Sequence, residues 1–194
     1  KENLWSGLRF DDMVATARRT VQEVKDREHP DVIVGLFHSG WDGGIVTEDY
    51  TEDASRRVAE EVAGFDVVLF GHDHRPHESV VENGEGQEVV CLDPANNARK
   101  AAVATIQLVE KEGQWRVAKK EGSIVDVADL EPDAGYMDHF AAAIDSVKAW
   151  AEQPLGTFKH EISTRDSYFG SSAFNDLILN LELQITKADI AFNA

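Results

Sequence analysis

The sequence offers little that could cross-link the chain or anchor it in a membrane. Cys91 is its one cysteine, so no disulfide can form within the 194 residues. No apolar run approaches the roughly 20 residues that a membrane-spanning helix needs. The opening "KENLWSGLRF" contains neither an initiator methionine nor a secretory hydrophobic segment. We therefore expect a soluble chain that is a piece of a longer protein.

Positive charge is also scarce. The chain has 19 Lys and Arg against 36 Asp and Glu, which gives a formal net charge of -17. This excess of negative charge disfavours binding to a nucleic-acid backbone or to anionic lipid, because no local Lys/Arg cluster offsets it. We expect no nucleic-acid duplex among the partners, and we expect Cys91 to be a small buried hydrophobic residue of a strand.

Two short apolar runs without alternation are typical of central strands buried on both faces, residues 31–37 and 66–70. Between them, residues 51–63 have the apolar spacing of a helix, with Thr51 as its N-cap and Gly64 as its end. The order strand, helix, strand predicts a parallel crossover in which both strands point the same way. An amphipathic helix precedes this unit, with an apolar stripe of Val14, Ala17, Val21 and Val24.

The pattern changes after residue 77. Shorter alternating runs up to residue 127, with turns at Asn83-Gly84 and Glu112-Gly113, predict an antiparallel meander beside the parallel strands. A connecting helix packed on a sheet is expected over 134–151, and "QPLG" at 153–156 is expected to be a boundary. Beyond it, the patterns predict a strand at 157–164, a helix from about Ser172 and a strand at 188–192.

Three of the seven histidines lie in one short segment, "GHDHRPH", which directly follows the second buried run. His38 follows the first run. Because parallel strands end at the same edge of a sheet, where open α/β sheets bind ligands, we expect His38, His72 and His74 to lie close together. Gly71 allows the chain to bend sharply there. Imidazoles with oxygen partners suit Zn, Mn, Fe or Co better than Ca, so the sequence predicts a metal site.

The combination of "LFHSG" with "DVVLFGHDH" one helix later resembles the second half of the motif set of calcineurin-like metallophosphoesterases. The intervening "EDASRRVAEEVAGFD" and the tail from "PLGTFKHEISTRDSYFG" onward are similar to bacterial 5'-nucleotidases and 2',3'-cyclic-nucleotide phosphodiesterases. The resemblance implies an α/β fold (α+β sandwich). It implies the C-terminal half of a four-layer αββα domain over 1–132, a connecting helix and linker over 133–153, and the start of an α/β substrate-recognition domain over 154–194.

The resemblance also implies a nucleotide phosphoester hydrolase with two divalent ions (Mn, Zn, Fe or Co), exported to the periplasm, the cell surface or the medium. In such a site His38 and His72 are ligands of one ion and His74 of the other. The motifs D-x-H, G-D and G-N-H-E/D of this family do not occur before Asp31. We therefore expect the catalytic residues to lie upstream of Lys1, the isolated chain to be inactive, and its partner to be the missing N-terminal half or a second copy.

A second hypothesis remains open, in which the three histidines serve a non-catalytic metal-binding or interaction module. Asp42 is expected to be a solvated loop carboxylate rather than the hydrogen-bond partner of a ligand imidazole. Asp73 inherits no role from the family motif. His77 and Arg75 are expected to lie on the surface. Structural roles are expected for Arg165 and Phe169, and the residues that bind substrate are not identified by the sequence.

Overall fold

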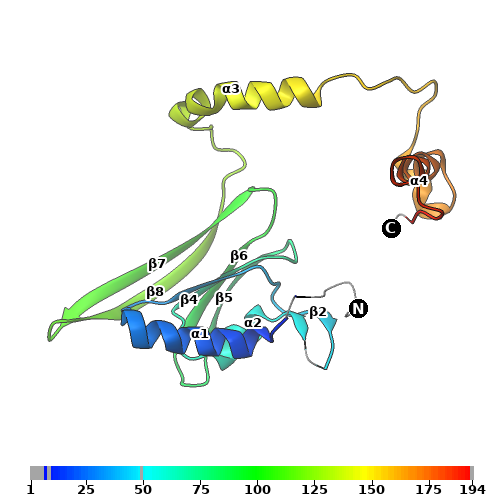
Figure 1. Ribbon diagram of the computed structural model, residues 1–194. Helices are drawn as coiled ribbons and strands as arrows, with labels where there is room; N and C mark the ends of the chain where they lie inside the picture. The colour runs from blue at the N-terminus through cyan, green and yellow to red at the C-terminus, as the bar shows by residue number, and fades with distance from the viewer. Residues whose placement is uncertain (1–6, 8–9, 49, 193–194) are drawn as a thin grey trace. The chain divides into compact units, whose positions relative to one another are not determined.

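The computed structural model describes residue 7, residues 10–48 and residues 50–192 (Figure 1). The chain divides into two compact units, Lys1–Glu131 and Pro132–Ala194, and each is described by itself. The predicted limits of the two domains and of the linker between them stay predictions.

The first unit is built around a four-stranded sheet in the order β1-β4-β6-β5. Strands β1, β4 and β6 run parallel, and β5 is antiparallel to β6. The mixed α/β class is the expected one. In chain order the elements are α1 (Met13–Glu28), β1 (Val34–Phe37), β2 (Gly43–Val46), β3 (Thr51–Asp53), α2 (Ser55–Glu61), β4 (Val67–Phe70), β5 (Pro76–Glu82), β6 (Glu88–Pro94), β7 (Lys100–Lys111) and β8 (Gln114–Asp126).

Both faces of this sheet are covered by apolar side chains over β4 and β6. Strand β1, predicted to be buried on both faces, lies at the edge of the sheet instead, and its Val34 and Leu36 are exposed. Helices α1 and α2 lie on one face and the long β7–β8 hairpin lies on the other (Figure 1). The α1 residues that bury their side chains, Val14, Ala17 and Val21, have the predicted helical spacing. Each fully buried Val or Leu contributes roughly 1.5–3 kcal/mol by leaving water. The sheet is thereby fixed as the middle layer of the unit.

The predicted start of α2 at Thr51 is wrong. Residues Thr51–Asp53 form β3, which pairs with β2, and the helix begins only at Ser55. The glycines of "WDGG" suggested a loop, but Gly43 and Gly44 take positive φ values inside the β2 strand. The backbone pairing of β2 with β3 therefore outweighs the capping tendency of Thr51.

The predicted meander is two separate hairpins. The β5–β6 hairpin joins the parallel sheet, because β6 pairs directly with β4, while β7 and β8 form a sheet of their own. Both predicted turns are confirmed. The side-chain Oδ1 of Asn83 accepts hydrogen bonds from the backbone N–H of Glu85 and Gln87. Glu112 and Gly113 both have positive φ, as a two-residue type I′ turn requires.

The second unit contains α3 (Ala134–Ala151), the 3-10 helix η1 (Thr164–Phe169) and α4 (Ala173–Thr186). Both predicted helices are confirmed as helices, and Ser172 caps α4 by accepting a hydrogen bond from Asn175 N–H. The expected packing of residues 134–151 on a sheet stays a prediction, since α3 has no buried residue in the described unit. The strands predicted at 157–164 and 188–192 are wrong, since the described part of this unit contains no strand with which either could pair. Arg165 and Phe169 are exposed, and their expected structural roles stay predictions.

Among the described residues, no helix is long and apolar enough to cross a membrane. Cys91 is fully buried in β6, as predicted.

Burial raises the pKa of the Cys91 thiol to about 12, because the thiolate would lose its hydration there. We therefore expect Cys91 of the native chain to resist alkylation by iodoacetamide at pH 8. The measurement is the mass of the chain after incubation, with the urea-unfolded chain as the control that must react. Alkylation of the native chain at the rate of the unfolded one would contradict the buried position of β6.

Candidate functional site

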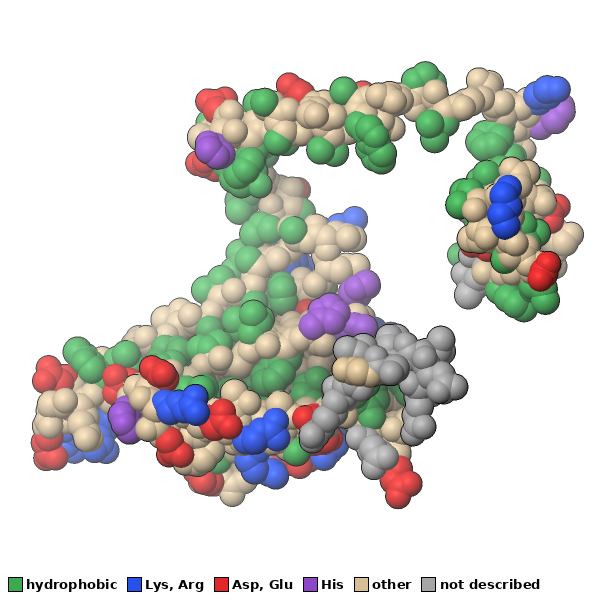
Figure 2. All heavy atoms as spheres, viewed as in Figure 1, with side chains coloured by type: hydrophobic (Ala, Val, Ile, Leu, Met, Phe, Trp, Pro, Cys, Tyr) green, Lys and Arg blue, Asp and Glu red, His purple; other side chains and the backbone are tan. Residues whose placement is uncertain are grey.

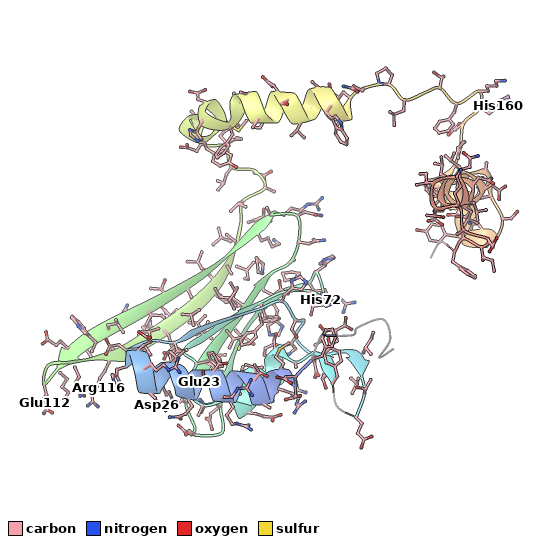
Figure 3. The ribbon with its side chains drawn as sticks, in the orientation of Figure 1. Glu23, Asp26, His72, Glu112, Arg116 and His160 are labelled. Carbon is pink, nitrogen blue, oxygen red and sulfur yellow. The ribbon has the colours of Figure 1, made fainter. Side chains whose placement is uncertain are left out.

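The parallel pairing of β1 with β4 determines where the histidines lie. The register runs from Val34 opposite Val67 to Phe37 opposite Phe70, so His38 and Gly71 leave the sheet at neighbouring positions. Histidine side chains gather on the surface of the unit in Figure 2, at the place where Figure 3 labels His72. Residues 34 positions apart in the sequence are thus brought together by the crossover.

The imidazoles of His38 and His72 face each other directly. Nε2 of His38 lies 3.3 Å from Nδ1 of His72, and the ring centroids are 5.1 Å apart with the planes at 71°. His74, whose φ of 58° is left-handed, follows in the same turn. All three predicted histidines line one cavity of about 440 Å³, together with Leu36, Phe37, Phe70, Gly71, Ala95 and Asn96.

The donor atoms of this cavity suit a divalent cation in part. Two nitrogen ligands at 2.0–2.1 Å from one ion are separated by about 3.0–3.4 Å, and the His38–His72 nitrogens have this spacing. The other ring nitrogen of His72, Nε2, lies 3.4 Å from Oε1 of Glu52. In the part of the chain that is described, however, no three His, Cys, Asp or Glu side chains converge on one point where they could hold an ion. The site is therefore a facing pair of imidazoles with a third imidazole in the same cavity.

Two carboxylates that the sequence did not single out as functional lie in the histidine turn and near it, in β6. Asp73 accepts a hydrogen bond at Oδ2 from Trp41 N–H (3.1 Å), and Asp93, at the end of β6, is fully buried. Burial raises the pKa of Asp93 to about 6, and the adjacent Asp73 adds to the shift. Partial burial acts to raise the pKa of Asp73, but hydrogen bonds from the backbone N–H groups of Trp41 and Arg75, together with the neighbouring carboxyl of Asp93, outweigh it and lower this pKa.

Three further predictions near the site have clear outcomes. Asp42 is an exposed loop carboxylate, as expected; its Oδ2 pairs with Arg56 at 2.6 Å and not with a ligand imidazole. His77 does not lie free on the surface: its ring stacks on Trp41 at 4.2 Å, and burial lowers its pKa. Arg75 is exposed, as expected.

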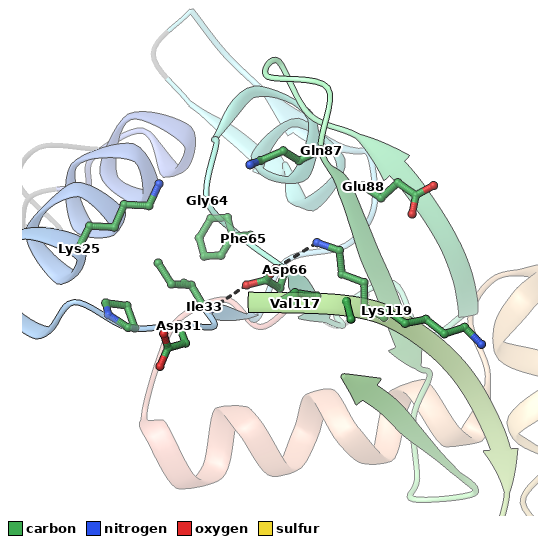
Figure 4. A pocket seen from close by; sticks show the side chains of 13 residues that line it. Lys25, Asp31, Ile33, Gly64, Phe65, Asp66, Gln87, Glu88, Val117 and Lys119 are labelled. Atoms are coloured by element: carbon green, nitrogen blue, oxygen red, sulfur yellow. Dashed lines mark hydrogen bonds and ion pairs between the residues drawn. The ribbon is translucent and has the colours of Figure 1, made fainter. Parts of the chain in front are cut away.

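A polar cavity of about 470 Å³ lies at the opposite, amino-terminal ends of β1 and β4 (Figure 4). Asp66 lines this cavity and is bonded to two neighbouring segments of the chain. The carboxylate accepts hydrogen bonds from Ile33 N–H and from the ammonium of Lys120, both of which are drawn as dashed lines in Figure 4. This pair fastens β8 to the start of β4. Because the charges of Asp66 and Lys120 are already paired and the histidines lie at the other end of the strands, we take the histidine cavity as the candidate site.

Comparisons with known proteins identify relatives of this chain. No family model matches the chain. It is 28% identical over 137 residues to the trifunctional nucleotide phosphoesterase protein YfkN of Bacillus subtilis, a match that covers 66% of this chain and 9% of that protein. It is 23% identical over 175 residues to the 2',3'-cyclic-nucleotide 2'-phosphodiesterase/3'-nucleotidase of Yersinia enterocolitica, covering 81% of this chain and 26% of that protein.

Solved structures agree in fold. The crystal structure of calcineurin-like phosphoesterase YfkN from Bacillus subtilis has a TM-score of 0.64 at 21% identity, over 78% of this chain and 48% of that chain. A 5'-nucleotidase precursor from Thermus thermophilus has a TM-score of 0.55 at 17% identity, over 91% of this chain and 35% of that chain. This chain spans less than half the length of each of these proteins. Its fold is that of the calcineurin-like phosphoesterases, and its relatives are nucleotide phosphoesterases, as the resemblance of its two histidine motifs implied.

Proposed function

We propose that this chain is part of a metal-dependent hydrolase of nucleotide phosphoesters, a 5'-nucleotidase or a 2',3'-cyclic-nucleotide phosphodiesterase. The observation that carries the proposal is the convergence of His38, His72 and His74 on one cavity at the carboxyl ends of adjacent parallel strands. The names of the relatives supply the substrate class. As the resemblance to the family implies, we place the protein outside the cytoplasm.

In this proposal His38 and His72 bind one divalent ion and His74 binds a second, of Mn, Zn, Fe or Co. Such a pair of ions neutralises the charge of a phosphoester and so removes the repulsion that protects it from attack. Imidazole ligands suit a site that must attract a phosphate. A chain with a net charge of -17 repels a phosphate, and neutral imidazoles hold cations without cancelling their positive charge.

The test uses the full-length gene product that carries these residues, supplied with Mn²⁺ or Zn²⁺ and assayed on 5'-AMP and 2',3'-cyclic AMP. We expect hydrolysis of at least one of them, and a loss of at least about 100-fold in kcat/KM for His72→Ala. Lys159→Ala, an exposed change in the other unit, is the control. No turnover by a protein that nevertheless holds stoichiometric metal would favour a non-catalytic metal-binding module.

We further propose that polypeptide outside these 194 residues covers the open edge of β1. On the side away from β4, β1 pairs with none of the described strands. Val34 is 50% exposed and Leu36 is 82% exposed. An apolar groove of about 780 Å³ between α1 and β1 borders this edge. The relatives are longer than this chain, so the same fold has further polypeptide available to fill the groove.

In isolation the exposed edge is expected to pair with a second copy, because an unpaired apolar edge strand is a template for association. We expect Leu36→Lys to convert concentration-dependent oligomers of the chain to monomers, as measured by multi-angle light scattering. Leu130→Lys is the matched control, because Leu130 is 67% exposed but lies outside the sheet. A monomer already present in the unaltered chain at high concentration would refute self-association at this edge.

A further inference from the structure

The two histidine loops need more than strand pairing to keep their imidazoles in register. The β1–β4 ladder ends at Phe37 and Phe70, one and two residues before the first histidine of each loop. The loop after β1 is tied to α2, since the backbone carbonyls of Gly40 and Trp41 accept hydrogen bonds from the N–H groups of Ser55 and Arg56. These bonds hold His38, but they do not reach the loop that carries His72 and His74.

Asp73 makes the connection between the loops. Its Oδ2 accepts a hydrogen bond from Trp41 N–H at 3.1 Å, across 32 residues of sequence. The approach is close, because a Cβ added at Gly40 would lie 3.0 Å from this Oδ2. Among the described residues, the other hydrogen bond between the loops is the contact of His38 with His72. A ligand that occupied those ring nitrogens would replace that contact, so the bond from Trp41 would remain.

Asp73 is also constrained by a buried neighbour and by its own turn. The fully buried carboxyl of Asp93 lies near it; Oδ1 of Asp93 accepts a hydrogen bond from Ala95 N–H at 2.6 Å, and Oδ2 is buried without a hydrogen-bond partner among the described residues. The other carboxylate oxygen of Asp73 faces Arg75 N–H at 3.4 Å, as in a turn closed by an Asp side chain. This turn holds His74 at a φ of 58°, a conformation that costs a residue with a Cβ about 1 kcal/mol or more.

We propose that Asp73 is a positioning residue, which fixes His72 and His74 relative to His38 by binding Trp41 N–H while it closes its own turn at Arg75 N–H. Asp73, between the two histidines of the motif, thus has a structural role, although the family motif leaves this position variable. Its role in metal binding rests on the proposed function, whereas its role in joining the loops does not.

The experiment compares Asp73→Ala with Asp73→Asn, which keeps an oxygen acceptor at this position. Asp42→Ala is the matched control, because Asp42 lies in the same loop as Trp41 but binds Arg56. The first measurement is the hydrogen-exchange rate of the Trp41 amide by NMR. We expect exchange to be at least about 10-fold faster in Asp73→Ala, and unchanged in Asp42→Ala and Asp73→Asn.

The second measurement is Zn²⁺ affinity by competition with a chromophoric chelator. Loss of a residue that orients metal ligands typically costs about 10–100-fold in affinity, and we expect this loss in Asp73→Ala with recovery in Asp73→Asn. Unchanged exchange at Trp41 in Asp73→Ala would overturn the proposal. If the unaltered chain binds no Zn²⁺, the metal assignment fails, and the exchange rate still decides whether Asp73 joins the loops.

Discussion

Metal binding by the 194-residue chain is expected to disappear in a His38→Ala/His72→Ala double variant. The unaltered chain, incubated with Zn²⁺ or Mn²⁺ and then desalted, is expected to keep close to one equivalent. The physical reason is the facing pair of ring nitrogens, whose separation of 3.3 Å suits two ligands of one ion. Without them, His74 alone cannot compete with water and buffer for a cation. The measurement is metal content per chain by plasma mass spectrometry.

His139→Ala/His160→Ala is the matched control for this experiment. Both of these histidines are exposed and lie in the second unit, so their removal changes the histidine count equally but leaves the cavity intact. Metal retained by the His38/His72 variant at the level of the control would refute the assignment of these ligands. Absence of metal from every variant, the unaltered chain included, would mean that two imidazoles of this chain do not suffice to hold an ion.

The meeting of the histidine loops could be predicted because it follows from backbone topology. Two apolar runs joined by a helix predict parallel strands, and parallel strands end at one edge whatever side chains follow. Placing His38 and His72 together required no knowledge of side-chain packing. The buried stripe of α1 was predictable for a similar reason, because Val14, Ala17 and Val21 repeat at the helical period.

The residues that support the histidines could not be predicted in this way. Asp73 and Asp93 come from different strand ends, and neither lies in a pattern that distinguishes it from a solvated acid. Their roles depend on the pairing of β6 with β4 and on the close approach of the Gly40 backbone to the Asp73 carboxylate. The position of β6 was itself missed, because alternation in a hairpin does not reveal which sheet the hairpin will join. The surface position predicted for His77 was wrong because its ring contacts with Trp41 and Phe70 form only when the chain folds.

A Gly122→Val substitution in β8 is expected to cost about 3 kcal/mol or more of unfolding free energy, because it overpacks the contact between the hairpin and the sheet. A Cβ at this position would lie 2.6 Å from Cγ1 of Val90 and 2.7 Å from Cδ2 of Leu92. Both of these side chains belong to β6 and are essentially inaccessible to solvent, so they have no free space into which to move. The hairpin must therefore lift from the sheet or β6 must shift.

Ser123→Val is the matched control for this second substitution. Ser123 is the next residue of the same strand and is exposed, and successive side chains of a strand point to opposite faces. The free energy of unfolding, from urea titration followed by far-UV circular dichroism, is expected to change by no more than about 0.5 kcal/mol in this control. Equal stabilities of the two variants would contradict the close packing of β8 on β6. Because Asp93 belongs to β6 and lies near Asp73, a shift of β6 is also expected to weaken the protection of the Trp41 amide.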